Sequence, residues 1–229
     1  MTSDFESFYD ALQLGFQRRY RDGLAFSATY TWARNQSTNV APWDSNVIER
    51  FDAANDVRHR VVVTATYELP FGRSRTGLMG ALLGNWQVNG VAIWQSGLPF
   101  DITNATARSN TGGSDRPNLV GDPGLENRTV EQWFNTVAFE PQPANTIGEA
   151  MVERNLLHGP SRSHVDLSLF KTLPLGDTMR LQLRVEAFNV FNNASFGNPN
   201  GALGSAAFGQ ITSTIGTPRQ MQFAAKFLF

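Results

Sequence analysis

The side chains best suited to chemistry in this sequence are its histidines, His59, His158 and His164. His164 and Asp166 are two residues apart, so in a β-strand both would lie on one face, where a metal would still need a third ligand from elsewhere. Solvated polar positions explain all three histidines more simply. The sequence has no cysteine, which excludes a thiol nucleophile, a disulfide scaffold and a thiolate metal site.

The usual signatures of catalysis and nucleotide binding are also missing. The sequence has no HExxH, GxxxxGK[ST], GxGxxG or GxSxG motif. Nineteen Lys and Arg residues against 20 Asp and Glu residues give a net charge of −1, which argues against nucleic-acid binding. We therefore expect no enzymatic activity, no metal, no cofactor and no nucleic-acid partner.

A second group of charged residues lies along one predicted strand. Arg180, Arg184 and Glu186 alternate with apolar residues, so they share one side of that strand. They could form a functional charge ladder facing an enclosed aqueous space. The simpler interpretation is that they occupy ordinary positions facing water or, in a barrel that holds a plug, facing that plug, where charge costs little.

The long segment from Asp101 to Arg162 is the best candidate for ligand contact, because long loops on a rigid scaffold often carry recognition. Within it, Thr129 and Gln132 have capping-box spacing, which predicts a short helix through Trp133 and Phe134. Two interpretations of its aromatic residues remain open. They could form a contact surface at the mouth of a barrel, or a small core of the loop itself, made of Trp133, Phe134 and Phe139.

The elements that position these residues are predicted by alternation of apolar and polar side chains. In residues 24–32 one side reads Leu, Phe, Ala, Tyr, Trp and the other Ala, Ser, Thr, Thr. Comparable alternation recurs six more times. The seven predicted strands are 12–17, 24–32, 61–69, 86–94, 165–169, 180–187 and 220–229.

The connections between these strands alternate between short and long. This pattern indicates an antiparallel meander with short turns at one end and long loops at the other, as in transmembrane β-barrels with short periplasmic turns and long extracellular loops. A strand of about 10 residues at ~3.4 Å each, tilted by about 40°, covers roughly 26 Å, close to the height of a membrane's apolar band. A soluble β-sandwich is the alternative, and it would bury Leu24, Val63 and Leu183 between two layers.

Large aromatic residues fall near the ends of the predicted strands. Trp32 and Trp94 lie at the long-loop ends, whereas Tyr20, Tyr67 and Trp86 lie at the short-turn ends. This placement is typical of the two aromatic girdles at the membrane interfaces. Two cations on the same side, Arg18 and Lys171, are expected to extend into the lipid headgroups.

Six ordered blocks of sequence resemble the C-terminal part of Oar-like TonB-dependent outer-membrane receptors. They are FDAANDVRHRVVVTATYELPFG (51–72), NWQVNGVAIWQSGLPFDI (85–102), RPNLVGDPG (116–124), HVDLSLFKTLPLG (164–176), FNVFNNASFGNPNG (188–201) and FGQITSTIGTPRQMQFAAKFLF (208–229). The resemblance implies an all-β fold: an antiparallel up-and-down meander of about seven strands, the C-terminal arc of a large transmembrane β-barrel with long extracellular loops. Residues 1–229 would then be a partial barrel domain, without the plug and N-terminal domains of such receptors.

The resemblance also implies an assembly signal in the last strand. In this family the chain end reads polar, any, Gly, any, any, aromatic, any, aromatic, and it is read by the barrel-assembly machinery. Here the pattern falls on Gln222, Ala224, Phe227 and Phe229, with Ala224 in place of glycine. A final strand with a free edge can pair with another sheet before its own barrel closes.

The function implied is that of a receptor in the bacterial outer membrane that passes a large solute using energy from TonB. The expected partners are outer-membrane lipid, the barrel-assembly machinery, the TonB complex acting through the missing plug, and an unidentified solute or a carbohydrate or peptide ligand. Two alternatives remain: a secreted carbohydrate-binding β-sandwich that stacks sugars on tryptophans, and a passive structural or adhesive barrel.

Overall fold

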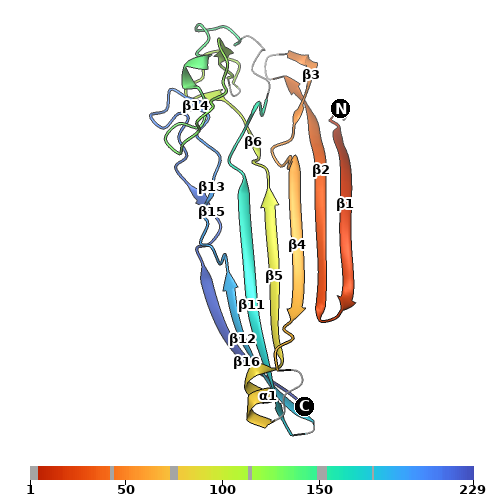
Figure 1. Cartoon of the computed structure of the whole chain (residues 1–229). Helices are drawn as coiled ribbons and strands as arrows, with labels where there is room; N and C mark the ends of the chain where they lie inside the picture. The colour runs from red at the N-terminus through yellow and green to blue at the C-terminus, as the bar shows by residue number, and fades with distance from the viewer. Residues whose placement is uncertain (1–4, 42–43, 73–76, 113–114, 149–153, 177) are drawn as a thin grey trace.

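The computed structural model describes residues 5–41, 44–72, 77–112, 115–148, 154–176 and 178–229. Its central feature is one antiparallel eight-stranded sheet, the main sheet, with the order β1-β2-β4-β5-β11-β12-β16 and with β3 paired to the outer part of β2 (Figure 1). The strands are β1 (Ser7–Arg21), β2 (Leu24–Ala41), β3 (Asp44–Asp52), β4 (His59–Glu68), β5 (Trp86–Gln95), β11 (Arg162–Leu175), β12 (Met179–Phe188) and β16 (Gln220–Leu228).

The register of the main sheet sorts the side chains onto two chemically different faces. Tyr30 lies opposite Leu14 and Val61, and Val61 lies opposite Trp94, so these apolar residues share one face, which we call the apolar face. One position along, Thr31 lies opposite Arg60, which lies opposite Gln95, on what we call the polar face. Because side chains alternate with period two, the register aligns the apolar sides of all seven predicted strands.

The apolar face is covered by no second layer of the described residues. Leu14, Phe16 and Phe223 are 56%, 64% and 72% exposed, and Leu183 is exposed as well. The β-sandwich alternative, which required Leu183 to be buried between two sheets, is therefore wrong. An exposed apolar face of this extent indicates a sheet whose surroundings are hydrocarbon.

The two ends of the main sheet differ as the alternating connections predict. The β1–β2 turn consists of Asp22 and Gly23, with φ of 56° and 84°, as a two-residue type I′ hairpin turn requires. The β4–β5 connection, which holds α1 (Gly77–Leu83), and the short β11–β12 connection lie at the same lower end (Figure 1). The long connections meet at the upper end.

These long connections fold into a compact unit, the cap, made of the described residues of 96–161 and 189–219. Its small elements are β6 (Pro99–Phe100), β7 (Thr103–Asn104), β8 (Asn118–Leu119), η1 (Thr136–Ala138), β9 (Phe139–Glu140), β10 (Leu157–His158), β13 (Ser195–Phe196), β14 (Ala202–Leu203) and β15 (Thr214–Ile215). Four two-stranded pairings join them: β10 with β6, β13 with β15, β14 with β7, and β8 with β9. The pairing of β14 with β7 links the two long loops to each other.

Where the cap joins the main sheet, the segment that leaves β5 and the segment that returns to β11 are in close backbone contact. The chain leaves β5 and returns to β11 through two adjacent segments, in which the Gly159 amide donates to the Leu98 carbonyl at 2.9 Å. A Cβ atom on Gly97 would lie only 1.7 Å from the Gly159 carbonyl oxygen. Only glycine fits at position 97, so the two segments touch backbone to backbone.

Two expectations about local structure are wrong. The sheet has an eighth strand, β3, and β2 continues to Ala41. This part of the sheet was not expected, because β2 and β3 form a projecting hairpin whose polar sequence lacks apolar alternation.

The capping box does not open a helix. The Gln132 amide donates to Thr129 Oγ1 at 3.1 Å, but the Thr129 amide donates back to the Gln132 carbonyl and closes a turn. The nearest helix is the 3₁₀ turn η1. Within the described residues, no helix has the length and apolarity needed to cross a membrane.

Candidate functional site

The apolar face carries four of the five predicted girdle aromatics, at two levels. Trp32 lies opposite His59, and Trp94 lies opposite Val61, so both tryptophans mark the level where β4 begins and β5 ends. Tyr67 and Trp86 lie near the opposite end of the same face. Tyr20 lies just before the β1–β2 turn, inside the irregular stretch between Arg18 and Arg21, where the register gives it no partner on β2. Trp32 is at the middle of β2 rather than at its end, because β1 and β2 extend beyond this level.

Lys171 does not extend into lipid headgroups as expected. It is only 6% exposed, and its Nζ donates to the Leu82 carbonyl at 3.2 Å and also to the Gly84 carbonyl. The ammonium group also lies 5.1 Å from the centre of the Trp86 ring. Lys171 therefore binds the carbonyl end of α1, where a positive charge is favoured, and it fixes this short helix to the sheet.

The polar face consists largely of hydroxyl and amide groups that bond to one another. Ser27 Oγ and Thr64 Oγ1 are 2.8 Å apart, and Asn89 Nδ2 donates to Ser168 Oγ at 3.3 Å. Gln87 Nε2 also donates to Asn89 Oδ1 at 2.7 Å. A surface of this kind is compatible with water and unsuited to hydrocarbon.

The structure places Arg180, Arg184 and Glu186 on this polar face. Arg184 Nε donates to Gln182 Oε1 at 2.8 Å, and its guanidinium lies 4.7 Å from the centre of the Phe170 ring. These partners hold Arg184 flat against the sheet. Arg180 borders an open hollow of about 450 Å³ at the short-turn end, lined by Glu68, Leu69, Asn85, Trp86, Gln87, Thr172, Pro174 and Arg180.

The predicted assembly signal forms most of β16. Gln222 lies opposite Glu186 and Ala224 opposite Arg184 on the polar face, whereas Phe227 lies opposite Leu181 on the apolar face. β16 pairs with β12, and its other edge has no partner strand among the described residues. Phe229 follows the strand and is fully exposed. The geometry is that of an edge strand with a continuous apolar side.

The aromatic residues of the long loop form the core of the cap. Phe134 is 2% exposed, and its ring centre lies 5.6 Å from that of Phe139 and 5.1 Å from that of Phe208. Phe208 belongs to the other long loop, so this core holds the two loops together. Trp133 is half-buried, and its Nε1 donates to the His158 carbonyl at 2.9 Å. The interpretation of these residues as a loop core fits this packing; a contact surface would require Phe134 to be exposed.

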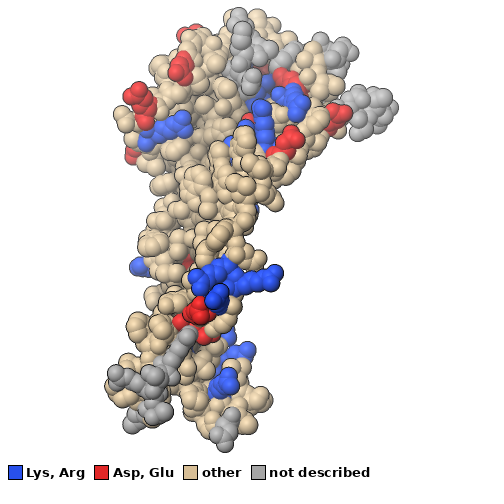
Figure 2. Space-filling model, turned by 45° about the vertical axis from the view of Figure 1, so that its right-hand side comes forward, with Lys and Arg blue, Asp and Glu red and all other residues tan. Residues whose placement is uncertain are grey.

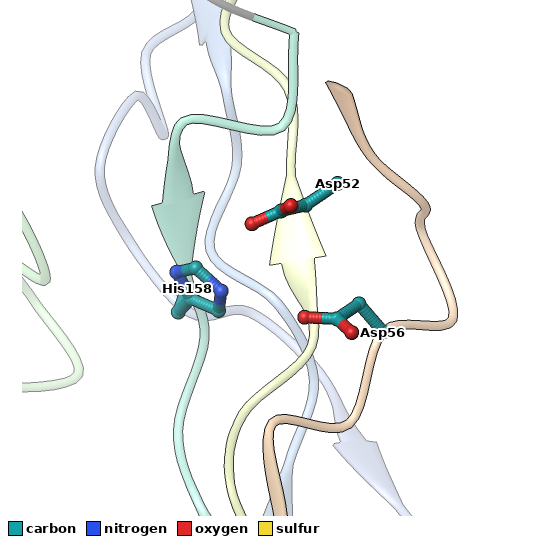
Figure 3. Close-up of side chains that lie close together, drawn as sticks. All are labelled: Asp52, Asp56 and His158. Atoms are coloured by element: carbon teal, nitrogen blue, oxygen red, sulfur yellow. The ribbon is translucent and has the colours of Figure 1, made fainter. Parts of the chain in front are cut away.

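Three potential metal ligands that the sequence analysis did not connect lie together where the cap meets β3. Side-chain atoms of Asp52, Asp56 and His158 lie within 4.8 Å of one another, and the three side chains converge in Figure 3. All four carboxylate oxygens already accept hydrogen bonds, however. Arg34, Gln36 and Arg58 donate to Asp52, whereas Arg58 and the Asn35 amide donate to Asp56. The arrangement is that of an ion-pair network that joins strands and cap.

The electrostatics of this network agree with its contacts. Burial alone would raise the pKa of Asp52, but hydrogen bonds from Arg34 and Gln36, together with the charge of Arg58, hold that pKa below its usual value. Burial lowers the pKa of His158, and the nearby Arg58 lowers it further, which favours the neutral imidazole. Asn155 Nδ2 donates to the Asp52 carbonyl at 2.7 Å and adds a second link from the cap.

The other two histidines have separate partners. His59 Nδ1 lies 2.8 Å from the Tyr30 hydroxyl, and His164 Nε2 lies 2.7 Å from Asp166 Oδ1. The spacing of His164 and Asp166 predicted that these two would share a face. Nothing in the sequence connected Asp52 and Asp56 with His158, because the three come from two separate connections that meet only in the fold.

A membrane-facing apolar belt, an opposite polar face and long loops at one end define the wall of an outer-membrane β-barrel. The comparison with family models agrees: residues 1–222 match the family described as outer membrane beta barrel domain, and the chain belongs to this family. No curated protein and no solved structure matches it. The protein is therefore a β-barrel protein of the bacterial outer membrane.

Proposed function

We propose that this chain forms part of the barrel wall of a TonB-dependent receptor, which moves a large solute across the outer membrane by energy coupling. The observation that carries the proposal is the open main sheet: among the described residues, β1 and β16 each have one unpaired edge. Unpaired backbone groups cost several kcal/mol each in hydrocarbon. Further strands must cover these edges, and transporters with 22-stranded, plugged barrels would supply them.

The polar face supports a lumen of that kind. Its hydroxyl, amide and guanidinium groups extend along the sheet from Arg60 to Arg180, which suits contact with water and with a polar plug. In this proposal Arg184 and Glu186 are part of the wall that the plug packs against. The TonB complex acts on that plug, and the barrel-assembly machinery recognises β16.

The cap supports a receptor rather than a bare pore. It has its own aromatic core and is tied to β3 by a close ion pair, in which Arg116 Nη2 donates to both oxygens of Glu49 at 2.7 and 2.6 Å. A loop unit held this firmly presents a fixed surface at the barrel mouth. The solute class that we propose for this surface is a large polar molecule such as a carbohydrate or peptide.

The proposal can be tested by measuring ion conductance. The complete receptor is reconstituted in a planar bilayer, and current is recorded before and during exposure of one side to urea. A plugged barrel is expected to be silent at rest and to open a large, steady conductance when urea unfolds the plug. In cells, the same receptor should be captured by a photocrosslinker on TonB, and capture should fall when an uncoupler collapses the proton-motive force.

Two outcomes contradict the proposal in a defined way. A steady conductance without urea would identify a passive pore. Silence both with and without urea, together with no capture by TonB, would identify a structural or adhesive barrel.

A further inference from the structure

The end of the β1–β2 hairpin carries the densest run of cations in the chain, QRRYRD at residues 17–22. It contains Arg18, Arg19 and Arg21 but a single carboxylate, Asp22, which gives the hairpin a formal charge of +2. Figure 2 shows a cluster of basic side chains, with acidic side chains directly below it, in the lower half of the molecule; a surface with few charges separates this cluster from the charged cap. Because the short turns of outer-membrane barrels face the periplasm, this hairpin lies at the periplasmic leaflet.

A β-bulge directs two of these arginines to the apolar face. Arg18 pairs with Phe26 and Arg21 pairs with Leu24, so three residue steps on β1 oppose two on β2. Phe26 and Leu24 both lie on the apolar face. Strict alternation would have placed Arg18 and Arg21 on opposite faces, and the extra residue brings both to the membrane side.

The guanidinium groups are exposed and only weakly neutralised. The side chains of Arg18 and Arg21 are 41% and 84% exposed. Their contacts to Asp22 Oδ2 are long, at 3.8 and 3.5 Å, and exposed pairs of this kind contribute little. Arg18 also donates to the Arg21 carbonyl at 3.3 Å, which holds it near its neighbour. Both arginines therefore retain donors for an anion.

The surroundings suit a whole phospholipid rather than an anion alone. The residues from Arg18 to Asp22, including Tyr20, line a shallow hollow of about 600 Å³. Phe26 lies opposite Arg18 on the apolar face, its ring packs against that of Phe16 with the centres 5.4 Å apart, and Phe16 is exposed. A phosphate in the hollow would place its acyl chains against these two rings.

We propose that the β1–β2 hairpin is a binding site for an anionic phospholipid of the periplasmic leaflet. Arg18 and Arg21 bind the phosphodiester, Arg19 adds to the positive potential, and Phe16 and Phe26 contact the acyl chains. The site does not depend on TonB or on a transported solute, so it can hold even if the proposed transport function fails.

The test uses the complete receptor in bilayers of phosphatidylethanolamine and phosphatidylglycerol, with spin-labelled phosphatidylglycerol or phosphatidylcholine as the probe. The measured quantity is the preference of the protein for the anionic probe. The double variant R18Q/R21Q is expected to lower this preference about fivefold or more, since each arginine near an anionic surface contributes about a factor of five. The matched control R180Q/R184Q removes two arginines from the polar face and should change the preference for the anionic probe less than about twofold.

A second variant keeps the test decisive if R18Q/R21Q does not fold. Asp22→Asn removes the carboxylate and is tolerated in the left-handed turn conformation, where φ is 56°. It should raise the preference for phosphatidylglycerol. An unchanged preference in both hairpin variants, or an equal loss in R180Q/R184Q, would overturn the proposal. So would displacement of the lipid probe by inorganic phosphate at constant ionic strength, because that result would indicate a site for soluble anions.

Discussion

The main sheet and the cap use apolar side chains in opposite ways. In the main sheet, Phe16 and Phe223 lie on an exposed surface, whereas in the cap Phe134 and Ile102 are almost completely buried. The sheet gains its stability in lipid from backbone hydrogen bonds and an outward apolar face. The cap lies in water and must bury its own core. One chain therefore contains two solvent regimes, and the same residue type has a different role on each side of the Trp32 and Trp94 level.

The largest expected effect on stability is in the cap. Replacing Phe134 by Ala removes the ring that contacts Phe100, Phe139 and Phe208, and it should destabilise the cap by about 3 to 5 kcal/mol. Native-state hydrogen exchange should show faster exchange in the cap and unchanged protection in β4 and β5. Val137→Ala is the matched control, since Val137 is 79% exposed and its change should have little effect. Equal effects of the two changes would contradict a cap with its own core.

The next largest expected effect on stability is in the main sheet, where the same substitution is compared on the two faces. Val63→Arg places a charge on the apolar face in the middle of β4 and should destabilise the folded protein in lipid by about 3 kcal/mol. Thr64→Arg, one residue along on the polar face, should cost less than about 1 kcal/mol. Urea unfolding in lipid vesicles measures both. The assignment of the faces fails if Thr64→Arg is the more damaging of the two.

A somewhat smaller effect is expected where the sheet and the cap meet. Arg58→Leu leaves Asp56 fully buried without its cation, and it should destabilise the junction by about 2 kcal/mol, because Arg58 itself is partly exposed to water. Combining Arg58→Leu with Asp56→Asn should recover part of the loss, since the amide oxygen can still accept from the Asn35 amide. Limited proteolysis of the β3–β4 connection measures the effect, and no recovery in the double variant would argue against a charge-based role.

The smallest expected effect is a dependence on pH that is confined to the cap. Burial and Arg58 lower the pKa of His158 below its usual 6.5, so His158 favours the native state when it is neutral. As the pH falls below about 6.5, the unfolded chain takes up a proton that the native cap resists, and the cap loses stability. The lowered pKa of Asp52 acts in the same direction, but only as the pH approaches its usual 3.8.

The measurement is the urea midpoint of the cap between pH 7.5 and 5, followed by tryptophan fluorescence. His158→Gln should flatten the profile in this range, whereas His164→Gln on the main sheet should leave it unchanged. A steeper loss of stability in the His158→Gln variant would show that another group is responsible.

The sequence predicted the main sheet much better than the cap, for a physical reason. Membrane strands alternate between two solvents, so Leu24 to Trp32 and Leu181 to Ala187 each reveal their apolar side without knowledge of any partner strand. The cap has no such period. Its core joins Phe100, Phe134 and Phe208 from distant segments.

The errors have the same origin. The strand β3 was missed because its pairing with β2 in a projecting hairpin leaves no apolar side to detect. The Thr129 and Gln132 pair does form a hydrogen bond, but the neighbouring packing of Trp133 and Phe134 favours a turn. The meeting of Asp52 and Asp56 with His158 could not be read from spacing, because about 100 residues separate the two connections that supply them.

The contact between Gly97 and Gly159 limits how the outer opening can be regulated. With the Gly159 carbonyl so near Gly97, the two segments that join the cap to β5 and β11 pack backbone to backbone, which opposes their rotation past each other. The cap consequently keeps a fixed position relative to the main sheet and does not open as a hinged lid. In the transporter proposed above, control of solute passage would fall to groups inside the lumen or to small rearrangements of exposed loops, and not to movement of the cap as a whole.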